Sequence, residues 1–226
     1  KVLLDVHGLP GSQNGHDHSG KSGRAMWYKD SSNRKRGLDA TLKIAERYAS
    51  SPVLWGFQMM NEPRVGFLQI KLRRYYNQAY KKLTTILPAG VKIVFSDAFT
   101  PRLMSAAVWS NKRNPAYMDI HWYHFVGWGR LKPNVYKHLI AWHGRLIKSL
   151  RKWNGIIIGE WSGCYSQRIF DKYPVSTHNE MVRVHIERQL KAYRHADAWF
   201  YWSYKTEQPG VWNFKSLVDD GIVTLK

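Results

Sequence analysis

The feature that most constrains the fold is a regular alternation of short apolar runs with longer segments of helical spacing. The expected strands cover residues 2–6, 53–60, 91–95, 117–121, 156–158 and 198–204. The expected helices cover residues 38–49, 66–87, 101–108, 135–153, 178–195 and 213–218. Strand-then-helix alternation predicts a parallel sheet with helices outside it. The nearly continuous apolar strands predict burial of both sheet faces.

Two α/β architectures fit this pattern, a doubly wound open sheet and a (β/α)8 TIM barrel. The doubly wound sheet usually binds nucleotides through a Gly-rich first turn. Here that turn is His7-Gly8-Leu9-Pro10-Gly11, which lacks the GxGxxG order, and Pro10 offers no N–H donor. A barrel is therefore favoured. Because a barrel needs eight strands, we expect residues 1–226 to form one catalytic domain containing strands 3 to 8, with two strands upstream of Lys1.

The chain carries a formal net charge of +19, which attracts polyanions. Its basic residues form only short clusters, and its aromatic residues interleave with the apolar strands rather than with those clusters. No nucleic-acid-binding motif appears, so nucleic acid is not an expected partner. Adhesion to an anionic cell-wall polymer would also explain the basic charge and requires no such motif. The single cysteine excludes an internal disulfide, and no apolar run is long enough to span a bilayer.

Two glutamates follow hydrophobic runs directly, Glu62 after residues 57–61 and Glu160 after residues 156–159. In a barrel the carboxyl ends of the strands hold the active site. Closeness to water could explain one charged residue at a strand end, but it explains two such placements less well. Paired carboxylates are typical of glycoside hydrolysis, in which one protonates the leaving oxygen and the other meets the developing oxocarbenium ion.

Several motifs resemble the family 5 glycoside hydrolases, a family of retaining (β/α)8 enzymes. Asn61-Glu62-Pro63 resembles the acid/base motif of that family, and Gly159-Glu160-Trp161-Ser162 resembles its nucleophile motif. Within the family the exo-β-1,3-glucanase (glucan 1,3-β-glucosidase) group is most similar, through residues 5–15, 121–123 and 199–207. These five motifs occur in the order of the family and cover nearly the whole chain. The first two strands of the family are absent.

The resemblance implies an O-glycosyl hydrolase that cleaves β-glucosidic bonds in glucans, most similar to enzymes acting from the ends of β-1,3-glucan, in the extracellular space or cell wall. Glu160 would be the nucleophile and Glu62 the general acid/base. Tyr123 would orient Glu160, and His121 would support the acid/base side. The residues implied to contact the sugar are His7, Asp17 and Asn61, with Trp202 as a stacking platform. No metal or cofactor is implied.

Other readings of the sequence remain open. A barrel short of two strands could be a non-catalytic glucan-binding relic, and the charge could belong to a basic polyanion-binding protein. His16-Asp17-His18 could ligate a metal, although no third ligand at metal spacing is evident. His16 also stands where the resembling enzymes place a phenylalanine. Cys164 could be a nucleophile but lacks an evident partner, so it is expected to be a passive small residue near the site. The histidines His124, His138, His143 and His185 are expected to lie at the surface or partly in the core, with their ring nitrogens hydrogen-bonded.

Overall fold

The computed structural model describes residues 1–64, 69–126 and 132–224. The chain divides into two compact units. The first unit comprises residues 1–120 and 153–155, and the second comprises residues 121–152 and 156–226. No helix among the described residues is long and apolar enough to cross a membrane. The expectation of a single catalytic domain stays a prediction.

The first unit is built on four parallel strands that pair in the order of the chain. They are β1 (Val2–Asp5), β2 (Leu54–Gln58), β3 (Lys92–Ser96) and β4 (Ala116–Trp122), the last of which runs on into the second unit. The register matches Asp5 with Gln58 and Ser96 with Asp119. The segments that follow β1 and β2 therefore leave the sheet at the same edge.

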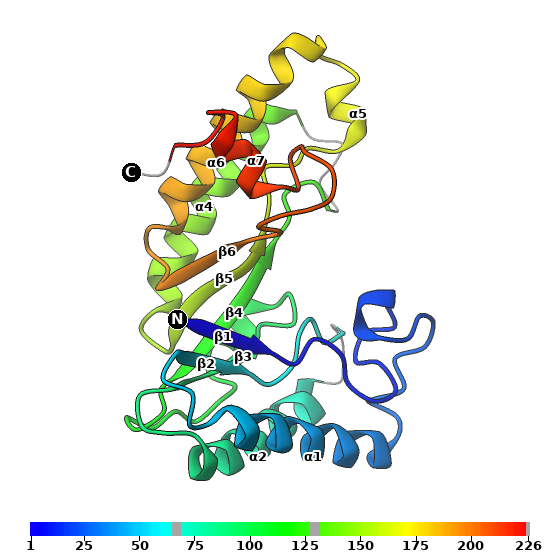
Figure 1. The fold of residues 1–226 in the computed structure, drawn as a ribbon, viewed down its shortest axis with the longest axis vertical. Coiled ribbons are helices and arrows are strands. Elements are labelled where there is room, and N and C mark those ends of the chain that lie inside the picture. The colour runs from blue at the N-terminus through cyan, green and yellow to red at the C-terminus, as the bar shows by residue number, and fades with distance from the viewer. Residues whose placement is uncertain (65–68, 127–131, 225–226) are drawn as a thin grey trace. The chain divides into compact units, whose positions relative to one another are not determined.

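Two long helices of the first unit, α1 (Ser31–Tyr48) and α2 (Gln69–Ile86), lie side by side against the strands (Figure 1). Helix α1 begins seven residues earlier than the sequence analysis expected. Its first turn is polar, so the apolar spacing does not reveal it, but Asp30 caps it by accepting a hydrogen bond from the Ser32 N–H at 2.8 Å. Helix α3 (Pro101–Met104) is shorter than the expected 101–108.

The second unit pairs β5 (Gly155–Trp161) in parallel with β6 (Ala198–Tyr201), and its long helices α4 (Pro133–Leu150) and α6 (His178–Tyr193) pack together (Figure 1). A last helix, α7, spans Phe214–Asp219 as expected to within a residue. Short elements that apolar spacing did not indicate are α5 (Gln167–Phe170) and the 3-10 turns Asp17–Ser19 and Val175–Thr177.

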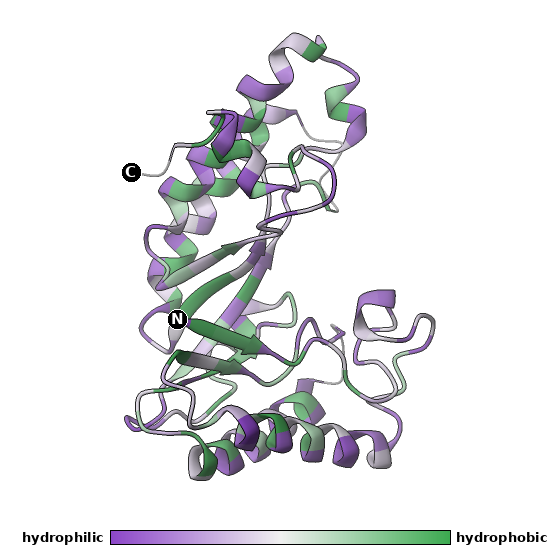
Figure 2. Cartoon of the chain, in the orientation of Figure 1, coloured by the Kyte–Doolittle hydropathy of each residue, from purple (hydrophilic) through white to green (hydrophobic). Residues whose placement is uncertain are grey.

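Hydrophobic residues concentrate on the strands, and the long helices alternate hydrophobic with hydrophilic positions, as the colours of Figure 2 show. In β5 the side chains of Ile156, Ile157 and Ile158 are all fully buried, which confirms that successive residues face apolar surroundings on both sides of the strand. One core expectation is wrong. His185 is buried, and among the described residues neither of its ring nitrogens has a hydrogen-bond partner. It is therefore not a core histidine whose ring is hydrogen-bonded, as was expected.

Candidate active site

One buried side chain, Gln13, holds together the segments that follow β1 and β2. Its amide nitrogen donates hydrogen bonds to the carbonyl oxygens of His7 and Asn61, both at 2.8 Å. Its amide oxygen accepts a hydrogen bond from the Leu9 N–H at 3.1 Å. Because burial makes an unpaired polar group costly, this network fixes the two segments in one arrangement.

His7 and Asn61 lie next to each other at this edge. The Nδ1 atom of His7 lies 2.7 Å from Asp5 Oδ2, and its Nε2 atom lies 3.4 Å from Asn61 Nδ2. A proton on Nδ1 would satisfy the carboxylate and leave Nε2 as the acceptor for the amide. The structure therefore brings together two of the side chains that were predicted to contact the sugar.

Glu62 follows Asn61 with a backbone φ of 38°, in the left-handed region that non-glycine residues rarely adopt. The Asn14 amide donates a hydrogen bond to the Glu62 carbonyl oxygen at 2.9 Å. His18 places its Nε2 atom 3.1 Å from Glu62 Oε2. A strained conformation costs on the order of 1–3 kcal/mol and persists where the surroundings over-determine it, often at functional sites.

His18 and Asn14 reach Glu62 from the loop between β1 and α1. Gly15 turns this loop with a φ of 86°, and a Cβ atom there would lie 2.4 Å from the carbonyl oxygen of Gly23. The sequence pattern indicates His18 only as a candidate metal ligand and indicates no role for Asn14. Asp17 instead exposes 91% of its side chain, with its Oδ1 3.9 Å from His18 Nδ1, so its predicted contact with the sugar stays a prediction.

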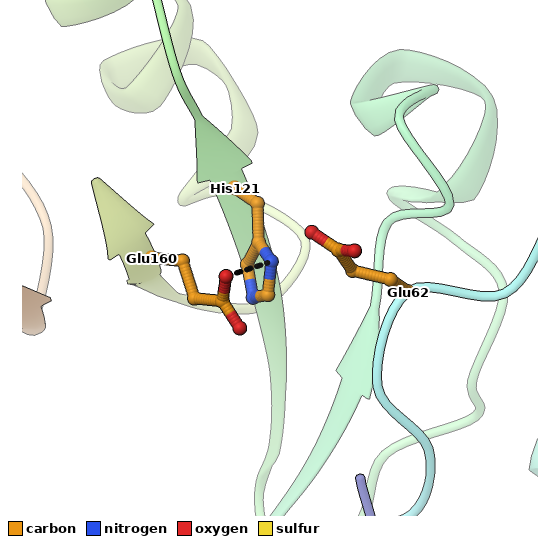
Figure 3. A group of neighbouring side chains, drawn as sticks. All are labelled: Glu62, His121 and Glu160. Carbon is orange, nitrogen blue, oxygen red and sulfur yellow. Dashed lines mark ion pairs between the residues drawn. The ribbon is translucent and has the colours of Figure 1, made fainter. Parts of the chain in front are cut away.

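Within the second unit, the carboxylate of Glu160 is buried near the end of β5. The hydroxyl of Tyr123 donates a hydrogen bond to Glu160 Oε2 at 2.9 Å, and His121 Nδ1 lies 3.5 Å from the same oxygen. Figure 3 draws His121 and Glu160, with their ion pair dashed, together with Glu62 from the segment after β2. The structure thus brings Tyr123 to the carboxylate that it is predicted to orient, and that role stays a prediction. For His121 the contact is with Glu160, and its support of Glu62 stays a prediction.

Aromatic side chains accompany Glu160 within the second unit. Trp202 follows β6 with 44% of its surface exposed, and its backbone N–H donates to the carbonyl oxygen of Trp161 at 2.9 Å. The Tyr123 ring lies 6.0 Å from the ring of Trp212, a residue that the sequence analysis did not single out. Cys164 lies nearby in sequence, and burial raises the pKa of its thiol to about 11, so it is a poor nucleophile.

Comparisons with known proteins bear on the family resemblance. No protein-family model matches the chain. The chain is 31% identical to "Probable glucan 1,3-beta-glucosidase A" of Aspergillus terreus, over 98% of its own length and 61% of the relative's. It is 28% identical to "Glucan 1,3-beta-glucosidase" of Blumeria graminis, over 99% of its length and 60% of the relative's. The resemblance to the glucan 1,3-β-glucosidase group is confirmed. The chain spans about three fifths of these relatives.

Solved structures extend the comparison to the fold. The rutinosidase from Aspergillus niger superposes with a TM-score of 0.79 at 16% identity, over 98% of this chain and 66% of that one. Thermotoga maritima Cel5A superposes with a TM-score of 0.61 at 19% identity, over 87% of this chain and 69% of that one. These matches confirm the predicted fold class, part of a (β/α)8 barrel.

Proposed function

We propose that the chain forms the catalytic part of a retaining glycosidase that hydrolyses β-glucosidic bonds in glucans, acting from the chain ends of β-1,3-glucan. The observation that carries this proposal is the setting of Glu160, a buried carboxylate with Tyr123 donating to one oxygen and His121 beside it. The names of the relatives support the glucan substrate. An extracellular or cell-wall location is part of the proposal.

Glu160 would act as the nucleophile. Its carboxylate would attack the anomeric carbon, the glycosidic bond would break, and a covalent glycosyl-enzyme would form. The hydrogen bond from Tyr123 favours the charged carboxylate and fixes its orientation. In the second step a water oxygen would attack the same carbon and release Glu160.

Glu62 would serve as the general acid in the first step, giving its proton to the leaving oxygen, and as the base that takes a proton from the water in the second. The contacts with Asn14 and His18 would hold it in place. A retaining mechanism requires the two carboxyl groups about 5–5.5 Å apart. We therefore propose that Glu62 and Glu160 face each other at about that separation.

The remaining predicted residues would bind the sugar. His7 and Asn61, fixed side by side through Gln13, offer a ring nitrogen and an amide to sugar hydroxyls. Asp17 would contact the sugar from the loop, and the half-exposed ring of Trp202 would stack against its apolar face. The reaction uses only these side chains and water, so no cofactor is required.

The test compares Glu62→Ala and Glu160→Gly on aryl β-glucosides whose leaving groups differ in pKa. Acid/base help is worth about 10²–10⁴-fold, so Glu62→Ala should lose much with poor leaving groups and little with good ones. Glu160→Gly should lose turnover with all of them, and added azide should restore some with inversion of the anomer. Glu46→Ala, an exposed carboxylate on α1, is the matched control and should keep full activity.

Three results would contradict the proposal. Equal losses for both variants across the series would show that the acid/base and nucleophile roles are wrongly assigned. Full activity of Glu160→Gly would show that Glu160 is not the nucleophile. A folded wild-type chain that binds laminarin-type oligosaccharides without cleaving them would indicate the non-catalytic relic instead. Release of single glucose units from those oligosaccharides supports exo action, whereas mixed shorter fragments would indicate endo action.

A further inference from the structure

The outer face of α2 carries a groove that no part of the proposed reaction uses. Its helical residues recur every three or four positions, so they line one face of the helix. The loop after α3 forms the opposite wall, and the groove has a volume of about 730 Å³. The lining residues used below are Arg73, Arg74, Asn77, Tyr80, Lys81 and Trp109.

Trp109 stands out because 85% of its surface is exposed. The loop that carries it is fixed to α2 rather than loose. The Asn77 side chain accepts a hydrogen bond from the backbone N–H of Trp109 at 3.1 Å and donates one to the Ala107 carbonyl oxygen at 2.7 Å. The Tyr80 hydroxyl accepts a bond from the Asn111 N–H at 2.7 Å. A large apolar ring is thus held toward solvent on a prearranged support, which reduces the entropy lost on binding.

The charged residues that line this groove are all basic. Between Glu62 and Asp119 the sequence contains ten lysines and arginines and a single acidic residue, Asp97, which is buried. In the described part of the chain, Arg73, Arg74 and Lys81 form no ion pair with a carboxylate. Arg73 donates to the carbonyl oxygen of Ala106 at 2.9 Å, so its charge is held at the groove wall.

We propose that this groove binds an acidic polysaccharide, with a pyranose ring stacked on Trp109 and carboxylates paired with Arg74 and Lys81. A pyranose presents an apolar C–H face that fits a flat indole, and guanidinium groups pair well with carboxylates. Single-stranded nucleic acid is the weaker fit, because its binding surfaces present several aromatic platforms for successive bases. In this groove Trp109 is exposed, whereas the Tyr80 ring is buried. The site is independent of the proposed hydrolysis.

The experiment measures binding of polygalacturonate oligomers to the 226-residue chain by calorimetry, with the fully methyl-esterified oligomer as the uncharged match. Trp109→Ala should weaken binding about tenfold, through loss of the stacking surface. The double variant Arg74→Glu/Lys81→Glu should weaken it by at least about tenfold. The control double variant Arg36→Glu/Lys43→Glu, on exposed positions of α1, makes the same change in net charge and should cost less than about twofold. Cleavage of aryl glucosides should not change in any of them.

Several outcomes would overturn the proposal. Equal weakening by the two double variants would assign the binding to net charge alone. Equal affinity for the methyl ester would show that the carboxylates do not contribute to binding, and unchanged affinity in Trp109→Ala would show that stacking on Trp109 does not contribute. Tighter, Trp109-dependent binding of oligothymidylate would indicate nucleic acid. A dimer in sedimentation that Trp109→Ala dissociates would indicate that a second copy of the chain covers the groove.

Discussion

Stability at mildly acidic pH should depend on a buried imidazole cluster in the second unit, formed by His124, His143 and His185. His124 Nε2 lies 3.2 Å from His143 Nδ1, and the His185 ring lies 5.4 Å from that of His124. Burial lowers the pKa of His124 to about 4 and that of His143 to about 3, the latter with help from the neighbouring His124. The pKa of His185 is well below 6.5, mainly because the ring is buried and, to a lesser degree, because of the nearby charges of His124 and Arg188.

The direction in which stability changes with pH follows from the direction of these pKa shifts. Above pH 6.5 the three imidazoles are neutral in both the folded and the unfolded chain, so they contribute no pH dependence. Below pH 6.5 the unfolded chain binds protons that the folded chain does not, and the free energy of unfolding falls. At 1.36 kcal/mol per pH unit, each histidine lowers the free energy of unfolding by about 2 kcal/mol between pH 6.5 and pH 5. Three such losses approach the whole stability of a typical domain, about 5–15 kcal/mol.

The assay is urea unfolding followed by tryptophan fluorescence at pH 7 and at pH 5. We expect the wild-type chain to lose several kcal/mol between these values, by the linkage described above. His185→Phe removes a titrating ring whose nitrogens have no hydrogen-bond partner among the described residues, so it should keep its stability at pH 7 and lose about 2 kcal/mol less at pH 5. His138→Gln, exposed on α4, should behave like the wild type. A flat wild-type profile, or an unchanged slope in His185→Phe, would refute the reasoning.

Three further expectations concern the candidate site. Gln13→Leu removes the partner of three backbone groups, two of them in buried hydrogen bonds, and should lower the free energy of unfolding by about 2–4 kcal/mol in urea, whereas the exposed Gln78→Leu should change it by less than about 0.5 kcal/mol. Tyr123→Phe removes the hydrogen bond to Glu160 and should lower kcat about tenfold or more in aryl-glucoside assays, with Tyr48→Phe as the unaffected exposed control; equal activities would contradict this. Turnover of neutral laminarin-type glucans should change little from low to moderate salt while retention on anionic matrices falls steeply, and a large loss of turnover would argue against a neutral substrate.

The strands were predictable because burial on both faces leaves a direct record in the sequence. The expected strand 91–95 became Lys92–Ser96, and 117–121 became Ala116–Trp122. Helix starts were less predictable where the first turn faces solvent. Helix α1 begins at Ser31 in a polar stretch, and the signal that marks it is the cap at Asp30, not apolar spacing. Four-residue helices such as α5 bury too few side chains to produce a period.

The positions of the two candidate carboxylates could be expected at strand ends, but the residues that hold them could not. A glutamate after an apolar strand is visible in the sequence, whereas the contact of His18 with Glu62 joins positions 44 residues apart through an irregular loop. The same holds for Trp212 beside Tyr123. Loop side chains have no periodicity, so neither hydropathy nor spacing indicates where they point.

Gln13 shows what this implies for the construction of the site. Parallel strands bring the segments after β1 and β2 to one edge, but they leave the exact approach of His7 to Asn61 undetermined. One buried amide satisfies the carbonyl groups of both residues, so the two segments can separate only if those groups are left unpaired. Asn14, the next residue, bonds the Glu62 carbonyl oxygen and thereby continues the same connection along the second segment. The loop motif that resembles the glucanases therefore contributes to the site twice, through the ring of His7 and through the side chains that position Asn61 and Glu62.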